Sequence, residues 1–139
     1  MYMNIAVIGS RKVDESSWEY IQKRLAVYVK PEDIIISGGA IGIDKLAERY
    51  AKENDIPTQI FLPNYKKFGS KQAPHERNML IVNTSDIVIA FWDGKSPGTR
   101  SVIAFAKRKN KRIVVYLLPK KFKNYTVPHL NSPLIQTNE

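Results

Sequence analysis

Residues 86–107 read DIVIAFWDGKSPGTRSVIAFAK and join an apolar run, a polar turn and an amphipathic stretch. The IVIAF run is almost wholly apolar and β-branched, which is typical of a strand that is buried on both faces. After the turn, Val102, Ile103 and Ala106 recur at helical spacing. A strand that leads through a turn into such a helix is the repeating unit of a parallel sheet with crossover helices.

The same alternation extends along the rest of the chain. Helices are predicted from Trp18 to Val29, across Leu46–Ala51, from Pro74 onward and from Gly98 to about Asn110. The sequence therefore predicts an α/β fold, in a Rossmann-like three-layer α/β/α arrangement with a mainly parallel sheet of about five strands. The predicted strands are Asn4–Ile8, Asp33–Ile36, Thr58–Leu62, Ile87–Phe91 and Arg112–Leu117.

The length of 139 residues matches one domain. We expect residues 1–118 to form this domain and residues 119–139 to be a basic tail packed on its surface. Pro119, Pro128 and Pro133 prevent a regular helix throughout that tail.

One segment between predicted elements is long for a connection. It runs from Pro63 to Ala73 and contains Tyr65, Phe68 and Gly69. Because long loops in compact domains are often functional, we interpret this segment as a loop that acts as a lid.

The composition is that of an ordinary globular protein, with 43% hydrophobic and 25% charged residues. The chain has no cysteine, which excludes disulfides and thiolate metal sites, and its two histidines, His75 and His129, lack ligand spacing. No metal site is therefore indicated. The N-terminal stretch MYMNIAVIGSR has no signal-peptide pattern and no apolar run approaches about 20 residues, so we predict a cytoplasmic protein without a membrane partner.

The net charge of +9 is concentrated in the last third of the chain. Residues 1–93 contain equal numbers of basic and acidic side chains, whereas residues 94–139 contain ten Lys or Arg and only Glu139. A basic face of this kind favours a polyanion or a phosphorylated ligand. The alternative is a solvated surface whose cations favour the end of a helix.

Three predicted strands end in polar turns that contain glycine: Gly9–Arg11, Ser37–Gly42 and Asp93–Thr99. In a parallel sheet these turns meet at one edge, where such folds bind ligands. Nearby helix N-termini offer unpaired N–H groups, and glycine lets the backbone approach a phosphate, so we expect an anionic ligand. The predicted ligand-binding residues are Gly9, Ser10, Arg11, Ser37, Gly38, Gly39, Ala40, Gly42, Asp44, Arg77, Asn78, Asp93, Ser96, Gly98 and Thr99.

These turns match neither common nucleotide motif. The first contains Gly9 alone and so lacks the G-x-G-x-x-G pattern, and the stretch Gly94-Lys95-Ser96 lacks the upstream glycine of a P-loop. Neither an NAD site nor a kinase-type ATP site is indicated, and no cofactor is predicted.

Three side chains near the turns have both a structural and a functional interpretation. Asp44 either favours the N-terminus of the second predicted helix or accepts hydrogen bonds from ribose hydroxyls. Arg77, with Asn78, is placed at the start of the third predicted helix, where a cation opposes the helix dipole, so we expect an acidic ligand to hold it there. Trp92 either stacks on a base or belongs to the core.

Together these motifs closely resemble the SLOG superfamily, the Rossmann-like domains named after Smf/DprA and the LOG enzymes, and in particular its small bacterial and phage branch of unknown function. The resemblance implies a ligand crevice in which Gly38, Gly39, Gly42 and Asp44 lie near the ligand and Gly98 and Thr99 lie at a phosphate. The matching stretches are AVIGSR at Ala6–Arg11, SGGAIGID at Ser37–Asp44, HERNMLIV at His75–Val82 and Asp86–Lys107.

The chain departs from the superfamily's hydrolases at one position. LOG-type phosphoribohydrolases carry PGGxGTxxE with a glutamate that acts in N-glycosidic cleavage, and Val102 stands in the place of that glutamate. A valine transfers no proton, so the mechanism would need a substitute carboxylate such as Asp44, Asp93 or Glu76. Arg77 corresponds to that family's Arg-bearing helix, and with Asp44 it is the candidate catalytic pair if the chain is an enzyme.

Three functions follow from this resemblance, in order of preference. The first is binding, as a sensor, of a nucleotide or nucleotide-derived small molecule. The second is N-glycosidic hydrolysis of nucleoside monophosphates. The third is binding of single-stranded nucleic acid through the basic C-terminal third, as in Smf/DprA. Related domains are often dimeric, so a homodimer is a further hypothesis.

Overall fold

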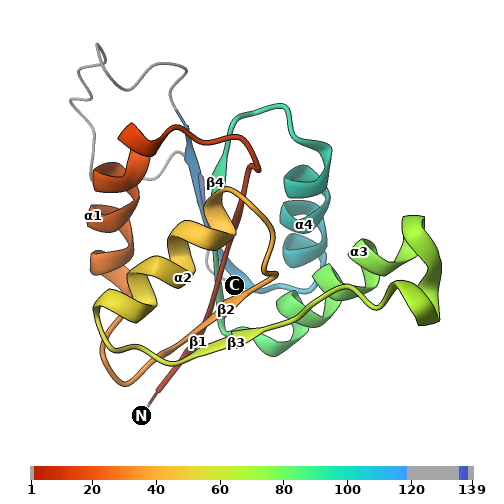
Figure 1. Cartoon of the computed structure of the whole chain (residues 1–139), viewed down its shortest axis with the longest axis horizontal. Helices are drawn as coiled ribbons and strands as arrows, with labels where there is room; N and C mark the ends of the chain where they lie inside the picture. Colours follow the sequence, from red (N-terminus) through yellow and green to blue (C-terminus); the bar gives the residue numbers. More distant parts are fainter. Residues whose placement is uncertain (1, 119–134, 138–139) are drawn as a thin grey trace.

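The computed structural model describes residues 2–118 and 135–137, which form one α/β domain around a six-stranded sheet (Figure 1). The strand order is β3-β2-β1-β4-β5-β6, and all neighbours are parallel except β5 and β6. The strands are β1 (Asn4–Gly9), β2 (Ile34–Ser37), β3 (Thr58–Ile60), β4 (Ile87–Trp92), β5 (Arg112–Leu117) and β6 (Ile135–Thr137). The helices are the 3₁₀ helix η1 (Glu15–Ser17), α1 (Trp18–Tyr28), α2 (Ile43–Glu53), α3 (Tyr65–Thr84) and α4 (Pro97–Arg108).

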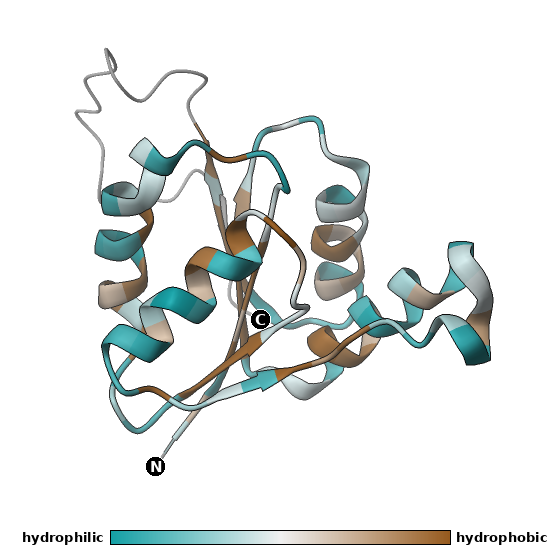
Figure 2. Ribbon diagram, viewed as in Figure 1, coloured by the Kyte–Doolittle hydropathy of each residue, from teal (hydrophilic) through white to brown (hydrophobic). Residues whose placement is uncertain are grey.

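Two hydrophobic clusters, one on each face of the sheet, form the core. Successive residues of a strand point to opposite faces, so Ile5 and Val7 of β1 pack with α1 and α2, whereas Ala6 and Ile8 pack with α3 and α4. The helices turn their apolar sides toward the sheet, as the brown inner side of α1 shows in Figure 2. This is the predicted three-layer α/β/α arrangement, and the Rossmann-like fold class is confirmed.

The strand order places a topological switch point between β1 and β4. From β1 the chain first builds β2 and β3 on one side, and then β4 and β5 on the other. The two crossovers that leave β1 and β4 therefore diverge, and a crevice opens beyond the carboxyl ends of these strands. Gly9 at the end of β1 pairs with Phe91 of β4, which fixes the inner wall of this crevice.

The predicted loop from Pro63 to Ala73 is wrong from Tyr65 onward, because α3 begins at that residue. The side chain of Asn64 caps α3 by accepting a hydrogen bond from the Lys67 N–H at 3.0 Å. Gly69 has φ 82° and ψ 172°, so it interrupts the helical backbone and lets a second helical segment follow the first. The first segment projects away from the sheet (Figure 1).

The remaining element predictions hold with small shifts at their ends. Asp14 caps η1 by accepting from the Ser16 N–H at 3.2 Å, and α1 follows directly after η1. β6 was not predicted, and it pairs antiparallel to β5 with Val115 opposite Ile135. The predicted tail otherwise lies outside the described residues. Among the helices that the structure describes, none is long and apolar enough to cross a membrane.

Arg24 of α1 is an unusual member of the core because its guanidinium is fully buried. The group lies over the ring of Tyr20, 4.4 Å from its centroid, and 5.7 Å from the ring of Tyr116. Its nitrogen atoms have no hydrogen-bond partner within the part of the chain that the structure describes. The aromatic faces offset part of the cost of burying this charge through cation–π attraction.

Asp33 fixes the start of the sheet. Its carboxylate accepts from the Met3 N–H and the Lys30 N–H, both at 2.9 Å, and its side chain is almost fully buried. These two bonds tie the segment before β1 to the turn before β2. A carboxylate that satisfies two backbone donors in a buried position is strongly coupled to the fold.

We expect Asp33→Ala to lower the free energy of unfolding by about 2–3 kcal/mol, because two backbone N–H groups lose their acceptor. Urea unfolding followed by circular dichroism measures this change. Glu32→Ala is the matched control, since Glu32 is exposed next to it and should change the stability by less than about 0.5 kcal/mol. Equal losses in both variants would contradict this assignment.

Candidate ligand-binding crevice

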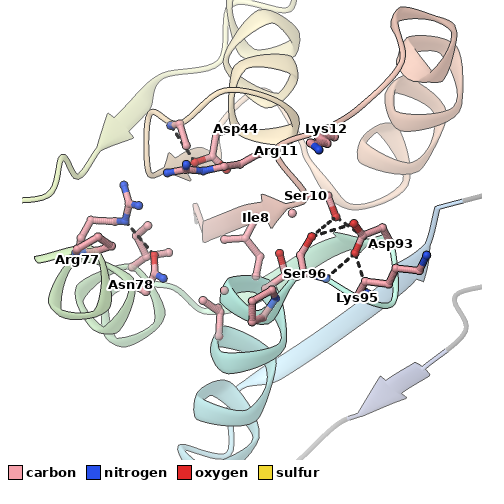
Figure 3. A pocket seen from close by; sticks show the side chains of 18 residues that line it. Ile8, Ser10, Arg11, Lys12, Asp44, Arg77, Asn78, Asp93, Lys95 and Ser96 are labelled. Carbon is pink, nitrogen blue, oxygen red and sulfur yellow. Dashed lines mark hydrogen bonds between the residues drawn. The ribbon is translucent and has the colours of Figure 1, made fainter. Parts of the chain in front are cut away.

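A cavity of about 560 Å³ lies beyond the carboxyl ends of β1 and β4 (Figure 3). Its walls come from the turn after β1, the turn before α2, the middle of α3 and the segment from β4 into α4. This volume is in the usual range of small-molecule sites. Of the predicted ligand-binding residues, the structure brings eleven together around it: Gly9, Ser10, Arg11, Ala40, Asp44, Arg77, Asn78, Asp93, Ser96, Gly98 and Thr99.

Four predicted residues of the second turn, Ser37, Gly38, Gly39 and Gly42, do not line the cavity. Gly42 has φ 85°, and a Cβ atom there would collide with the backbone oxygen of Ser10. The next residue, Ile43, donates its N–H to that same oxygen at 3.1 Å. Glycine is required at position 42 because two backbone segments of the protein meet there, and not because a ligand approaches.

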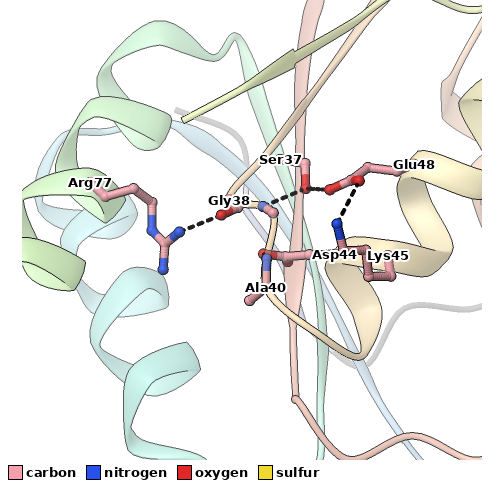
Figure 4. Close-up of polar contacts among 8 residues, drawn as sticks. Ser37, Gly38, Ala40, Asp44, Lys45, Glu48 and Arg77 are labelled. Carbon is pink, nitrogen blue, oxygen red and sulfur yellow. Dashed lines mark hydrogen bonds and ion pairs between the residues drawn. The ribbon is translucent and has the colours of Figure 1, made fainter. Parts of the chain in front are cut away.

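Ser37 has a structural role at the same turn (Figure 4). Its buried hydroxyl donates to Glu48 Oε2 at 2.9 Å and accepts from the Gly39 N–H at 3.2 Å. Lys45 forms an ion pair with Glu48 at 3.3 Å. The chain of contacts fixes the backbone of the second turn to α2.

Arg77 joins α3 to the second turn. Its Nη1 donates to the carbonyl oxygens of Gly38 at 2.5 Å and Phe61 at 3.3 Å, and its Nε donates to Asn78 Oδ1 at 2.9 Å. Arg77 lies in the middle of α3, so its predicted place at a helix start is wrong, and backbone carbonyls hold it. Burial lowers its pKa, while the nearby Asp44 charge opposes that change. Within the described residues its Nη2 has no hydrogen-bond partner, and the side chain lines the cavity.

Asp44 is the buried carboxyl group of the site. It is 8% exposed, and Oδ2 accepts from the Ala40 N–H at 3.1 Å (Figure 4). Burial raises the pKa of Asp44 to about 6, although that hydrogen bond and the charge of Arg77 act in the opposite direction. A backbone hydrogen bond from Gly38 also lowers the pKa of this carboxyl group, and Asp44 lines the cavity.

Asp93 organises the turn between β4 and α4. Its Oδ1 accepts from the backbone N–H groups of Lys95 at 2.8 Å and Ser96 at 2.7 Å, and its Oδ2 accepts from the Ser96 hydroxyl at 2.9 Å. Its own N–H donates to the Ser10 hydroxyl at 3.1 Å. Burial disfavours the charged form of Asp93, but the hydrogen bonds outweigh this effect and lower its pKa. The carboxylate is therefore occupied by the turn.

The N-terminus of α4 opens into the cavity. Ser96 is the N-cap residue and makes no side-chain cap hydrogen bond, so the first N–H groups of the helix are left without this partner. Thr99 is 6% exposed and lines the cavity, and within the described part of the chain its hydroxyl has no hydrogen-bond partner. A Cβ atom at Gly98 would meet open space. Unpaired donors at a helix N-terminus form an anion-binding arrangement.

Sequence reasoning missed two cations and an apolar wall. Lys12 and Lys95 line the cavity, and each stands next to a predicted residue in the sequence. With Arg11 and Arg77 they give four cations, against the two carboxyl groups of Asp44 and Asp93. The apolar wall consists of Ile8, Pro74, Ile81, Pro97 and Val102. The arrangement suits a ligand that is anionic and has an apolar or planar part.

Trp92 does not line the cavity. Its Nε1 donates to the backbone oxygen of Ser96 at 3.1 Å, and the Arg100 guanidinium lies 5.5 Å from its ring centroid. The structural interpretation of Trp92 therefore holds, and base stacking on it is not supported. Within residues 2–118 and 135–137 no cluster of side chains could hold a metal ion, and His129 lies outside them.

Comparison with known proteins identifies relatives over most of the domain. The family model of DNA recombination-mediator protein A matches residues 2–68. An uncharacterised protein of Archaeoglobus fulgidus is 29% identical over 119 residues, which cover 80% of this chain and 78% of that protein.

Two solved structures share the fold. DNA processing protein A of Streptococcus pneumoniae superposes with a TM-score of 0.72 and 19% identity, over 88% of this chain and 52% of that chain. The Helicobacter pylori protein of the same name, described for its single-stranded DNA binding mode, gives a TM-score of 0.68 and 23% identity, over 86% and 67% of the two chains. The present chain thus spans about half the length of the S. pneumoniae protein.

Gly42→Ala should lower the free energy of unfolding by about 2–4 kcal/mol. The backbone at this position has a positive φ, which alanine disfavours, and the new methyl group would collide with the backbone oxygen of Ser10. Gly98→Ala should change it by less than about 0.5 kcal/mol, since nothing lies within 4 Å of the new atom. Guanidinium unfolding of both variants measures the difference. A neutral Gly42→Ala would mean that the two turns do not meet as described.

The pKa of Asp44 predicts a pH dependence of stability. Its folded value of about 6 lies above the usual 3.8, so the folded state binds more protons between these values and stability falls as the pH rises from about 4 to 6. The difference corresponds to about 3 kcal/mol. Asp44→Asn cannot titrate, so it should not lose this stability. Its free energy of unfolding, measured by urea unfolding at each pH, should therefore rise relative to that of the wild type by about 3 kcal/mol between pH 4 and 6. Parallel pH profiles of the two proteins would contradict the burial of this carboxylate.

Proposed function

Since the chain belongs to the SLOG superfamily of Rossmann-like domains, we propose that its crevice binds a nucleotide or nucleotide-derived small molecule. The observation that carries the proposal is the N-terminus of α4, which presents the Thr99 hydroxyl and uncapped backbone N–H groups to the cavity. A phosphate satisfies these donors and benefits from the helix dipole. Lys95 adds a positive charge at the same end.

The rest of the cavity suits the remainder of such a ligand. Ile8, Ile81 and Val102 form an apolar surface that a base or sugar face can cover. The carboxyl group of Asp44 lines the cavity and is an acceptor for a hydroxyl or amino group. An apolar wall with a few convergent polar groups is the usual composition of a small-molecule site.

We favour binding over turnover because of Val102, which is 5% exposed on the cavity wall. Two of the candidate substitutes for the missing glutamate are unsuited to proton transfer. Asp93 is occupied by its turn, and Glu76 lies outside the cavity and accepts from Gln72 at 2.9 Å. The cavity then has one carboxyl group for acid–base chemistry, Asp44.

N-glycosidic hydrolysis is a second candidate function, and Asp44 is the residue that supports it. A buried carboxyl group with a pKa of about 6 exchanges its proton near neutral pH, which is the property of a general acid or base. Arg77 would then act as a positioning group for the substrate phosphate through its free Nη2.

Single-stranded nucleic acid is the third candidate partner. The H. pylori relative is described as a single-stranded DNA-binding protein, and cations of this chain gather on and beside α4. Arg100, Lys107, Arg108 and Lys109 are exposed there. Such a surface binds a polyanion by counterion release, with an affinity that falls steeply with salt. The homodimer and the cytoplasmic location remain predictions.

The test is calorimetric titration of the purified protein with a panel of nucleoside monophosphates, diphosphates and cyclic nucleotides. Thr99→Val should lower the affinity for any nucleotide that binds by about tenfold, because a hydrogen bond to a charged phosphate is lost. Thr58→Val is the matched control, since Thr58 is exposed on β3 and lies outside the cavity. Absence of binding by every nucleotide would refute the proposal.

Two parallel assays distinguish the other functions. Release of free base that disappears in Asp44→Asn would assign the hydrolase, whereas binding without turnover supports the sensor. Binding of an oligonucleotide with a log–log salt slope of about −0.7 per phosphate would assign the nucleic-acid function.

A further inference from the structure

We propose that the crevice recognises a nucleoside unit that carries acidic phosphates on both sides of its sugar, rather than a single phosphate or a pyrophosphate at one end. The inference rests on the proposed nucleotide-binding function and names the ligand class of the same site. It comes from the unpartnered donors, which belong to two separate elements that line one cavity, α3 and the N-terminus of α4.

The first end is the N-terminus of α4. Thr99 is more than nine-tenths buried, yet its hydroxyl has no hydrogen-bond partner among the residues described, and it lines the cavity. Lys95, in the turn before α4, also lines the cavity, and the Ser96 side chain makes no cap hydrogen bond to the first N–H groups of the helix. The hydroxyl is therefore open to the cavity, where a ligand or water completes its hydrogen bonding.

The second end is on α3 and is built independently of the first. Arg77 is 8% exposed, and its Nη1 and Nε are used by the protein while Nη2 is left without a partner in the described part of the chain. The neighbouring Asn78 accepts from Arg77 through Oδ1, which fixes its amide and leaves Nδ2 as a second donor into the cavity. A guanidinium N–H beside an amide N–H is a common arrangement for phosphate oxygens.

An apolar surface separates the two ends. Figure 3 shows Arg77 and Asn78 on one side of Ile8, and Lys95 and Ser96 on the other. Because the two sets of donors lie on opposite sides of Ile8, we assign a separate phosphate to each. A nucleoside between two phosphates has an uncharged middle and two anionic ends, which matches the order of the lining residues.

The charges of the crevice agree with such a ligand. Its four cations exceed its two carboxyl groups, and Asp44, next to Arg77, is itself buried in a position where desolvation disfavours its charge. The cavity as a whole therefore keeps an excess of positive charge. A ligand with two phosphates would offset more of this excess than a ligand with one.

The same unit occurs in two chemical sources. A free nucleoside 3′,5′-bisphosphate carries phosphates on both sides of its sugar, and so does every internal nucleotide of a single strand. The experiment therefore compares adenosine 5′-monophosphate, adenosine 5′-diphosphate, adenosine 3′,5′-bisphosphate and a single-stranded oligoadenylate by calorimetric titration at constant ionic strength.

The bisphosphate should bind at least tenfold more tightly than both the monophosphate and the diphosphate. The diphosphate is the matched control, because it also has a second phosphate but carries both at one end. If instead the oligoadenylate shows the tenfold advantage and the free bisphosphate does not, the same unit is recognised within a strand. A diphosphate that binds as tightly as the better of these two would overturn the inference.

Variants at each end test the two half-sites separately. Asn78→Asp places a negative charge at the α3 end and should remove the tenfold advantage, because it should weaken the bisphosphate at least threefold more than the monophosphate. Thr99→Val should weaken the binding of all four ligands. Lys107 lies on α4 outside the cavity, so Lys107→Gln should not change the affinity for any of the free nucleotides. Thermal unfolding confirms that each variant is folded.

The outcomes separate this inference from the proposed function. If the monophosphate binds with no advantage for a second phosphate, or if Asn78→Asp weakens every ligand equally, the two-ended site is wrong and nucleotide binding stands. If no nucleotide binds, the proposed function itself fails.

Discussion

The close approach of three backbone segments at the end of β1 is the constraint on which the site depends. Gly9 lies so near to β4 that a Cβ atom would collide with the carbonyl oxygen of Phe91, and Gly42 lies equally near to the backbone of Ser10. The Ser10 N–H donates to Phe91 at 3.1 Å, and the Ile43 N–H donates to Ser10 at 3.1 Å. These contacts hold the turns after β1 and before α2 at one edge of the sheet, where they form two walls of the crevice.

Two buried charged groups then define the chemistry of that crevice. Arg77 reaches across from α3 and bonds the carbonyl oxygen of Gly38, and Asp44 lies on the other side of the same turn. A Cβ atom at Gly38 would approach Arg77 Nη1 to 2.7 Å and Asp44 Oδ2 to 3.0 Å, so the glycine allows both charges to lie close together. Both side chains also line the cavity, so the network that holds the turn places two charged groups at the wall of the crevice.

Local sequence signals failed where one element depends on a distant one. The helical segment before Gly69 has few buried residues and hence little periodicity, so only the Asn64 cap marks its start. Glycines of the second turn were predicted to face a ligand because glycine at a turn has the same local pattern whether a phosphate or another backbone segment approaches it. Lys12 and Lys95 were missed because a lysine in a polar turn carries no local mark of the cavity that it lines.

The sequence by itself determined the α/β class, the five parallel strands and the edge at which the cavity lies, because buried strands, amphipathic helices and polar turns are patterns of adjacent residues. Eleven of the fifteen predicted ligand-binding residues line the cavity for the same reason, since the carboxyl ends of parallel strands share an edge. Only the tertiary structure decided the rest: which donors remain unpaired, that Arg77 is held by backbone carbonyls, and that burial raises the pKa of Asp44. These properties depend on distances between segments far apart in the chain, and no local pattern of residues contains them.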